Sequence, residues 1–266
     1  MPPTLLALDF DGVVCDGLLE YFQTAWKAYC EVFQPASSVP PEGLADRFYP
    51  LRPVVETGWE MPLVLYGLLT GVPDGDILDH WPALIPPLLA QSAVDSAHLG
   101  AAVDGVRDGW IEADLTGWLG LHRFYPGVIP RLKQAMDDRI SLVIISTKEG
   151  RFIEQLLAIE GLALSSDRIF GKEMKQPKYE ILRRLKATYG DEYSSIWFVE
   201  DRLNALQAVQ RQPDLGEVQL FLADWGYNTA TDRAAGQNSP PIRLISLDQF
   251  SQPFAAWPAS VDHKLA

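Results

Sequence analysis

LLALDFDGVVCDG, residues 5–17, is an apolar run that ends in two aspartates, Asp9 and Asp11, with one residue between them. Because alternate residues of an extended chain project to the same side, we expect the two carboxylates to crowd one position. Like charges at such short range raise one another's pKa unless a cation or a proton lies between them. The alternative is an ordinary strand that runs into an Asp-Gly turn. These residues alone leave both interpretations open.

Four further apolar runs are typical of buried strands, namely residues 141–146 (SLVIIS), 195–201 (SIWFVED), 218–225 (VQLFLADW) and 242–247 (IRLISL). Between the first two lie the segments GRFIEQLLAIEGL and PKYEILRRLKATYG, in which apolar residues recur three and four apart, as in helices. Strands that alternate with helices predict an α/β fold with a doubly wound parallel sheet. Ligands of such sheets bind outside the carboxyl ends of the strands. Asp9, Ser146 and the pair Glu200–Asp201 are expected to meet there.

Residues 16–123 differ in character from the rest of the chain. They carry aromatic residues, prolines and helix-like periodicity, without convincing alternating or β-branched runs. We therefore expect an α-helical domain inserted after the first strand. Residues 1–15 and 124–266 would then form the α/β domain, with FYPGV at 124–128 returning the chain to the sheet.

The composition of the 266 residues, 47% hydrophobic and 21% charged, is that of a globular protein of enzyme size. The formal net charge of −13 argues against nucleic-acid binding, which needs a basic surface. The two cysteines form neither a disulfide framework nor a zinc spacing. The N-terminal residues lack the basic segment of a signal peptide, and the apolar stretches are too short and too interrupted by proline to span a bilayer. We expect a cytoplasmic monomer or homodimer without a nucleic-acid or membrane partner.

Four short motifs follow one another along the chain. They are DFDG with Asp9 and Asp11, VIISTK with Ser146, KQPKYEIL with Lys175 and Lys178, and WFVEDR with Glu200 and Asp201. In this order they resemble the motifs of the haloacid dehalogenase superfamily, in the subgroup with a helical cap inserted after the first strand. Phosphoglycolate phosphatases and β-phosphoglucomutase-like proteins belong to that subgroup. The resemblance covers nearly the whole chain.

The resemblance implies a Mg²⁺-dependent phosphatase that hydrolyses a small phosphorylated metabolite. Asp9 would attack phosphorus and form an aspartyl-phosphate, and Asp11 would act first as general acid and then as general base. Mg²⁺ prefers oxygen ligands. Asp9, the backbone carbonyl of Asp11, Asp201 and Glu200, directly or through water, would provide them. Such a cation would let the paired aspartates share one position while ionised.

Three residues are candidates for contacts to the phosphate. Gly12 would let the chain turn and bring backbone N–H groups close to it. Ser146, or Thr147 in its place, would donate a hydrogen bond to a phosphoryl oxygen. Ser146 has a simpler alternative as the N-cap of the following helix.

A lysine at the start of a helix would neutralise charge on the phosphate and on the nucleophile. Lys178 is favoured over Lys175 because Pro177 suits the first position of a helix. Either lysine could instead be solvated on the surface. Glu200 or Asp201, taken singly, could instead cap the helix that follows.

Asp11 favours phosphoryl transfer over dehalogenation, because family members that cleave carbon–halogen bonds usually lack an acid at its position. A phosphomutase of the same family stays open, as does a catalytically idle binding protein of the same fold. In the expected cap, Arg47 and Arg52 are the only arginines among residues 1–100. Either could bind a substrate carboxylate or a second phosphate through two parallel hydrogen bonds, although a surface or packing role is the commoner one.

Overall fold

The computed structural model describes residues 2–257, which divide into two compact units. Residues 2–16 and 123–257 form one unit, and Gly17–His122 form the other. The predicted α/β domain extends to residue 266, and its residues 258–266 lie outside the described part of the chain.

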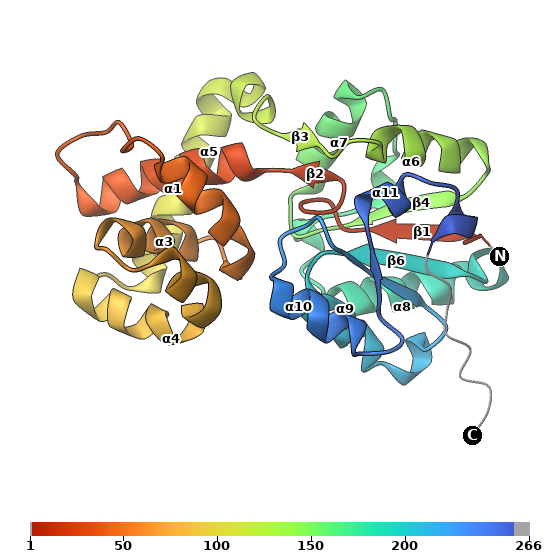
Figure 1. Cartoon of the computed structure of the whole chain (residues 1–266). Coiled ribbons are helices and arrows are strands. Elements are labelled where there is room, and N and C mark those ends of the chain that lie inside the picture. Colours follow the sequence, from red (N-terminus) through yellow and green to blue (C-terminus); the bar gives the residue numbers. More distant parts are fainter. Residues whose placement is uncertain (1, 258–266) are drawn as a thin grey trace. The chain divides into compact units, whose positions relative to one another are not determined.

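A six-stranded sheet forms the centre of the first unit, in the order β5-β4-β1-β6-β7-β8 (Figure 1). Its strands are β1 Leu5–Leu8, β4 Ser141–Ile145, β5 Ile169–Phe170, β6 Ile196–Glu200, β7 Gln219–Ala223 and β8 Arg243–Ile245. Every pairing is parallel, and in the register Leu8 lies opposite Ile144 on β4 and Val199 on β6. The predicted α/β fold with a parallel sheet is therefore confirmed. The strand order reverses at β1, which makes its carboxyl end the expected place for a ligand.

Helices cover both faces of this sheet, with α6 and α7 on one face and α8 and α9 on the other (Figure 1). The helices are α6 Val128–Asp137, α7 Gly150–Ile159, α8 Lys178–Tyr189, α9 Leu203–Gln210, α10 Ala230–Gln237 and α11 Leu247–Phe250. Short 3-10 turns at Ser166–Arg168, Lys172–Met174, Gly190–Tyr193, Pro213–Leu215 and Phe254–Ala256 lie between or after them. This double cover explains why β1 is an unbroken apolar run, since side chains on both of its faces are buried. One apolar cluster joins Leu5 and Ala7 of β1 to Leu182 of α8 and Leu206 of α9.

A two-stranded antiparallel ribbon marks where the chain leaves and re-enters the first unit. It pairs β2 Cys15–Asp16 with β3 Arg123–Phe124, so that Asp16 lies opposite Arg123. Each strand has only two residues. The ribbon holds the two ends of the inserted segment side by side.

Every regular element within Gly17–His122 is helical, as predicted for the inserted segment. The elements are α1 Leu18–Phe33, α2 Leu44–Phe48, a 3-10 helix at Tyr49–Val54, α3 Glu60–Leu69, α4 Asp74–Ser92 and α5 Ser96–Leu119. Helix α1 packs against α3 and α5. Within the described residues, no helix has the length and apolarity needed to cross a membrane.

A buried carboxylate links two helices of this second unit. Glu20 of α1 has no exposed surface, and its Oε1 accepts hydrogen bonds from Thr24 Oγ1 at 2.7 Å and Trp118 Nε1 at 3.1 Å. Arg107 of α5 forms an ion pair with it at 2.8 Å. The charge of Glu20 is thus matched inside the helical unit.

Candidate active site

The carboxyl ends of three neighbouring strands bring the predicted acidic and hydroxyl residues together. Asp9 follows β1, Ser146 follows β4, and Glu200 and Asp201 lie at the end of β6. The backbone N–H of Asp9 donates to Val199 O at 2.9 Å, which extends the ladder past the last residue of β1. All four side chains are buried. The strand pattern therefore predicted the place of these residues correctly.

Lys178 lies between two of these carboxylates. Its Nζ is 2.9 Å from Asp9 Oδ1 and 2.6 Å from Glu200 Oε2. Burial lowers the pKa of Lys178, but the charges of Asp9 and Glu200 raise it by more, so the pKa lies above its ordinary value. The lysine is therefore a fixed cation beside Asp9.

The structure distinguishes the two lysines of the KQPK segment. Lys178 is the first residue of α8 and reaches the acidic cluster. Lys175 is exposed, with a left-handed backbone at φ 50°, at the end of a 3-10 turn. Pro177 occupies the N-cap position of α8, so the helix begins one residue later than expected.

Asp9, Glu200 and Asp201 form a cluster in which one oxygen of each lies within 4.8 Å of the others. Asp201 Oδ2 accepts the backbone N–H of Tyr227 at 2.7 Å. Asp201 Oδ1 is buried and accepts no hydrogen bond from any residue in the described part of the chain. A buried carboxylate oxygen without a donor is costly unless a cation faces it. The donor set therefore fits an oxygen-seeking divalent cation.

Glu200 differs from Asp201 in having both oxygens engaged. Its Oε1 accepts the backbone N–H groups of Asp201 at 3.1 Å and Arg202 at 2.9 Å, and its Oε2 binds Lys178. The N-cap of α9 is Arg202, without a side-chain cap hydrogen bond. Neither acid caps α9, so the helix-capping alternative is wrong. Asp201 suits direct binding of a cation, and Glu200 holds the lysine.

The crowded carboxylates have raised pKa values. Burial, followed by the charge of Glu200, raises the pKa of Asp9 to about 7. Burial and the charge of Asp9 raise the pKa of Asp201 to about 6. Burial also raises the pKa of Glu200. A cation bound among them would favour the ionised forms.

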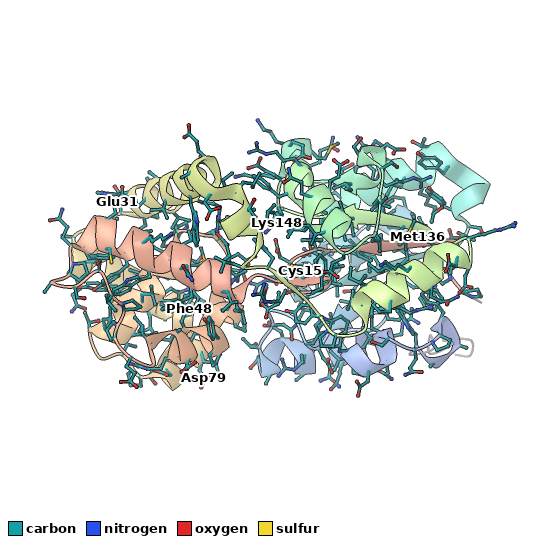
Figure 2. All side chains as sticks on the ribbon, turned by 90° about the horizontal axis from the view of Figure 1, so that it is seen from above. Cys15, Glu31, Phe48, Asp79, Met136 and Lys148 are labelled. Atoms are coloured by element: carbon teal, nitrogen blue, oxygen red, sulfur yellow. The ribbon has the colours of Figure 1, made fainter. Side chains whose placement is uncertain are left out.

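Asp11 faces a second lysine that the sequence analysis did not assign. Lys148, which is labelled in Figure 2, lies in the loop after β4. Its Nζ is 3.2 Å from Asp11 Oδ1 and 3.4 Å from Asp11 Oδ2. Both side chains are largely buried, with 9% of Lys148 and 16% of Asp11 exposed. The two aspartates of the DFDG motif thus pair with different lysines, Asp9 with Lys178 and Asp11 with Lys148.

Position 12 requires a glycine, because of both its backbone conformation and its surroundings. Its φ of +91° is in the region that favours glycine. A Cβ at this position would lie 2.0 Å from Asp201 Oδ2. The chain therefore passes directly over the candidate metal ligand, which only a glycine allows.

Ser146 and Thr147 begin the loop after β4. Ser146 Oγ accepts the backbone N–H of Lys148 at 3.2 Å, whereas α7 begins only at Gly150 and has Glu149 as its N-cap. The alternative in which Ser146 caps this helix is therefore wrong. Thr147 is exposed.

Two residues after β7 hold Asp201 and had no role in the sequence analysis. Tyr227 donates its backbone N–H to Asp201, and its hydroxyl donates to Asp16 Oδ1 at 2.9 Å. Asn228 donates to Asp201 O at 2.9 Å and to Ala223 O at 2.7 Å. A useful signal was the GYN segment directly after the predicted strand at residues 218–225.

The two arginines proposed for substrate binding lie in the helical unit. Arg47 forms a bidentate ion pair with Asp74, its Nη2 lying 2.5 Å from Oδ1. Arg52 donates to Val55 O at 3.0 Å and lies over the ring of Tyr21. Their substrate contacts stay predictions.

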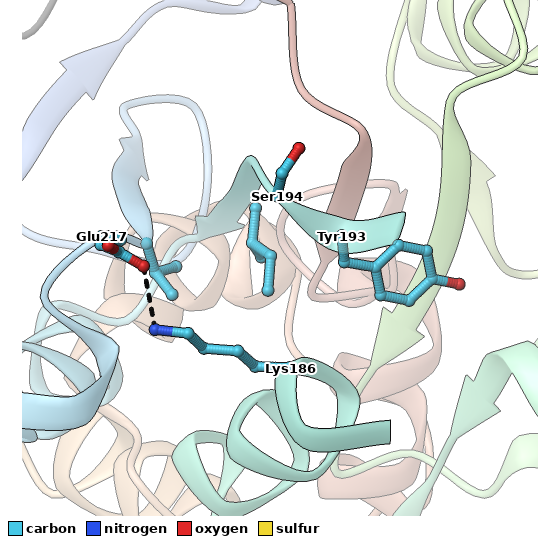
Figure 3. Close-up of a pocket in the computed structure, with 6 residues that line it drawn as sticks. Lys186, Tyr193, Ser194 and Glu217 are labelled. Carbon is cyan, nitrogen blue, oxygen red and sulfur yellow. Dashed lines mark hydrogen bonds and ion pairs between the residues drawn. The ribbon is translucent and has the colours of Figure 1, made fainter. Parts of the chain in front are cut away.

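A small pocket at the amino-terminal ends of β6 and β7 is separate from this site (Figure 3). It is lined by Lys186, Tyr193, Ser194, Ile196, Glu217 and Val218. Lys186 forms an ion pair with Glu217 there at 3.0 Å. The pocket lies at the opposite edge of the sheet from Asp9.

Several solved structures have a similar fold. A predicted phosphoglycolate phosphatase from Haemophilus somnus 129PT has a similar fold, with a TM-score of 0.58, 16% identity, and coverage of 93% of this chain and 95% of that chain. A predicted phosphatase from Clostridium acetobutylicum gives a TM-score of 0.55 at 18% identity, covering 94% and 97%. A haloacid dehalogenase-like family hydrolase from Streptococcus pneumoniae gives a TM-score of 0.56 at 14% identity, covering 91% of this chain and 93% of that chain.

By sequence, none of the curated proteins compared matches this chain. The model of one protein family matches residues 3–211, which include all four motifs and the residues of the acidic cluster. The chain belongs to the haloacid dehalogenase-like hydrolases.

Proposed function

We propose that this hydrolase is a Mg²⁺-dependent phosphatase that acts on a small phosphorylated metabolite through an aspartyl-phosphate on Asp9. One observation carries the proposal: Asp9 pairs with the cation of Lys178 and shares an acidic cluster with Asp201, whose buried Oδ1 has no hydrogen-bond donor among the described residues. A nucleophilic carboxylate needs charge compensation when it meets an anionic phosphate. Two proteins of similar fold, described as a predicted phosphoglycolate phosphatase and a predicted phosphatase, point to the same reaction class.

In the first step, a carboxylate oxygen of Asp9 would attack phosphorus. The bond from phosphorus to the ester oxygen breaks, and the electron pair goes to that oxygen. The protonated carboxyl group of Asp11 would transfer its proton there, so that a neutral alcohol leaves. The ammonium group of Lys178 and the hydroxyl group of Ser146 would bind phosphoryl oxygens.

In the second step, water would attack the phosphorus of the aspartyl-phosphate. The carboxylate of Asp11 takes the proton of the water, and the bond between phosphorus and Asp9 breaks. Inorganic phosphate leaves, and both aspartates return to their initial states. Lys178 stays on Asp9 throughout and stabilises the carboxylate as the leaving group.

Asp9, Asp201 and the backbone carbonyl of Asp11 would hold the Mg²⁺. When bound, the ion supplies positive charge that stabilises the transferring phosphoryl group. Both oxygens of Glu200 already accept hydrogen bonds, so this residue would hold Lys178 and not the ion.

The test measures phosphate release from p-nitrophenyl phosphate and a panel of small phosphate esters, with Mg²⁺ and with EDTA. Asp9→Asn is compared with Asp137→Asn, which changes an exposed aspartate at the end of α6. We expect activity that requires Mg²⁺, is lost in Asp9→Asn and persists in Asp137→Asn. Activity that survives in Asp9→Asn would contradict the covalent step. Products that keep the phosphate on a rearranged sugar would identify a phosphomutase instead.

A further inference from the structure

The loop after β4 holds Lys148 in one place. The backbone N–H of Ser146 donates to Phe170 O at 2.9 Å, and the N–H of Lys172 donates to Lys148 O at 2.9 Å. Glu173 accepts the N–H of Gly150 at 3.2 Å. Two backbone hydrogen bonds and one to the carboxylate of Glu173 thus anchor the loop to the segment around β5.

Lys148 meets both oxygens of one carboxylate, that of Asp11, and its own side chain is only 9% exposed. Asp9, two residues earlier, pairs with a different lysine, Lys178. Each aspartate of the motif therefore has its own cation. Because opposite charges at this distance attract, Lys148 holds the carboxylate of Asp11 in place.

We propose that Lys148 is a positioning residue for Asp11. It holds the carboxyl group of Asp11 in the orientation in which it would reach the leaving oxygen. The inference rests on the proposed phosphatase function, in which Asp11 protonates that oxygen. Lys148 itself transfers no proton and makes no bond to the phosphate; it acts through the orientation of Asp11.

Such a role has a distinctive kinetic signature. A strongly basic alkoxide needs its proton as it leaves, whereas p-nitrophenolate leaves readily without one. The parameter kcat/KM covers the steps up to the departure of the leaving group. Disturbing Asp11 should therefore reduce kcat/KM most for alkyl esters and least for p-nitrophenyl phosphate.

The experiment compares Lys148→Met, Lys148→Arg and Asp11→Asn with the wild type on aryl and alkyl phosphates of increasing leaving-group basicity. Lys133→Met, at an exposed lysine of α6, serves as the matched control. We expect Lys148→Met to reduce kcat/KM for alkyl esters by about tenfold more than for p-nitrophenyl phosphate. Lys148→Arg should restore part of this difference, and Lys133→Met should show none.

The double variant Asp11→Asn with Lys148→Met completes the test. If Lys148 acts through Asp11, the lysine substitution costs little further activity once Asp11 is already changed. Equal losses for all esters, or a rise in KM that persists in the Asp11→Asn background, would overturn the proposal and make Lys148 a structural or substrate-binding residue. A wild-type protein inactive on every ester would instead overturn the proposed function itself.

Discussion

Lys178 Nζ lies 2.9 Å from Asp9 Oδ1, and only 15% of the lysine side chain and 9% of the aspartate side chain are exposed. A buried ion pair depends strongly on both partners, because removing one leaves the other charged without compensation. Here the loss of the lysine would also leave the charge of Glu200 without its cation. The pair therefore serves stability as well as the proposed chemistry.

We expect Lys178→Met to lower kcat by about 100-fold or more, because a cation facing the phosphoryl group is lost. In the metal-free protein it should also lower the free energy of unfolding by about 3 kcal/mol at neutral pH. Steady-state kinetics and urea unfolding measure the two effects. Lys175→Met is the control and should change neither. If Lys175→Met proves the more damaging substitution, the assignment of the active-site lysine is wrong.

Removal of Mg²⁺ should make stability depend on pH. The pKa values of Asp9, about 7, and Asp201, about 6, lie above their ordinary value of 3.8. Between pH 3.8 and pH 7 the folded metal-free protein therefore binds more protons than the unfolded chain. Its stability should be highest near pH 4 and fall as the pH rises to 7. Mg²⁺ competes with these protons, so it should raise Tm more at pH 8 than at pH 5.

Asp201→Asn tests whether the pH-dependent stabilisation by Mg²⁺ comes from binding at the acidic cluster or from binding elsewhere on the protein. The substitution removes one buried charge but keeps an oxygen for the N–H of Tyr227. We expect a metal-free protein that is more stable than the wild type at pH 8 and gains little from Mg²⁺. Thermal unfolding with and without the ion measures both. A Tm increase by Mg²⁺ that is the same at pH 5 and pH 8 would show that the ion binds elsewhere.

The main strands were predictable because each is a run of buried apolar residues bounded by polar ones. β5 at Ile169–Phe170 and the strands of the ribbon were missed, since each has two residues and so no period to detect. Asp9 and Asp201 were predictable for a related reason. A carboxylate that directly follows a buried strand must emerge at the ligand-binding edge of a parallel sheet.

The partners of these residues were not predictable in the same way. Lys148 is 137 residues from Asp11, and nothing in VIISTK indicates which group the lysine will meet. Tyr227 binds Asp201 through its backbone N–H, a group that every residue except proline carries. Such contacts depend on how loops from different strands come together, which local sequence patterns do not encode.

Glu20 offers a test of the helical unit that does not involve the α/β site. Glu20→Gln should lower the free energy of unfolding by about 3 kcal/mol, because the buried pair with Arg107 is broken. Asp74→Asn breaks the exposed pair with Arg47 and should cost only about 0–1 kcal/mol. Urea unfolding of both variants gives the comparison. Equal losses would mean that the Glu20 network contributes no more than a surface pair.

Gly12 tests how closely the chain approaches the candidate metal ligand. Gly12→Ala puts a Cβ 2.0 Å from Asp201 Oδ2 and 3.0 Å from Tyr227 Cδ2, and also forces alanine to φ +91°. Gly71→Ala imposes nearly the same backbone cost at φ +93°, but nothing lies within 4 Å of its Cβ. The difference between the two variants therefore isolates the clash, which is mainly with Asp201. We expect both to lose about 1–2 kcal/mol of stability from the backbone, and Gly12→Ala to lose more.

The Mg²⁺ response decides what that additional loss means. If Asp201 must move to admit the Cβ, Gly12→Ala should weaken Mg²⁺ binding at least tenfold, while Gly71→Ala binds the ion like the wild type. Calorimetric titration with Mg²⁺ measures this on both folded variants. If Gly12→Ala is destabilised but binds Mg²⁺ normally, the clash is relieved by the loop rather than by Asp201, and the glycine serves the turn alone.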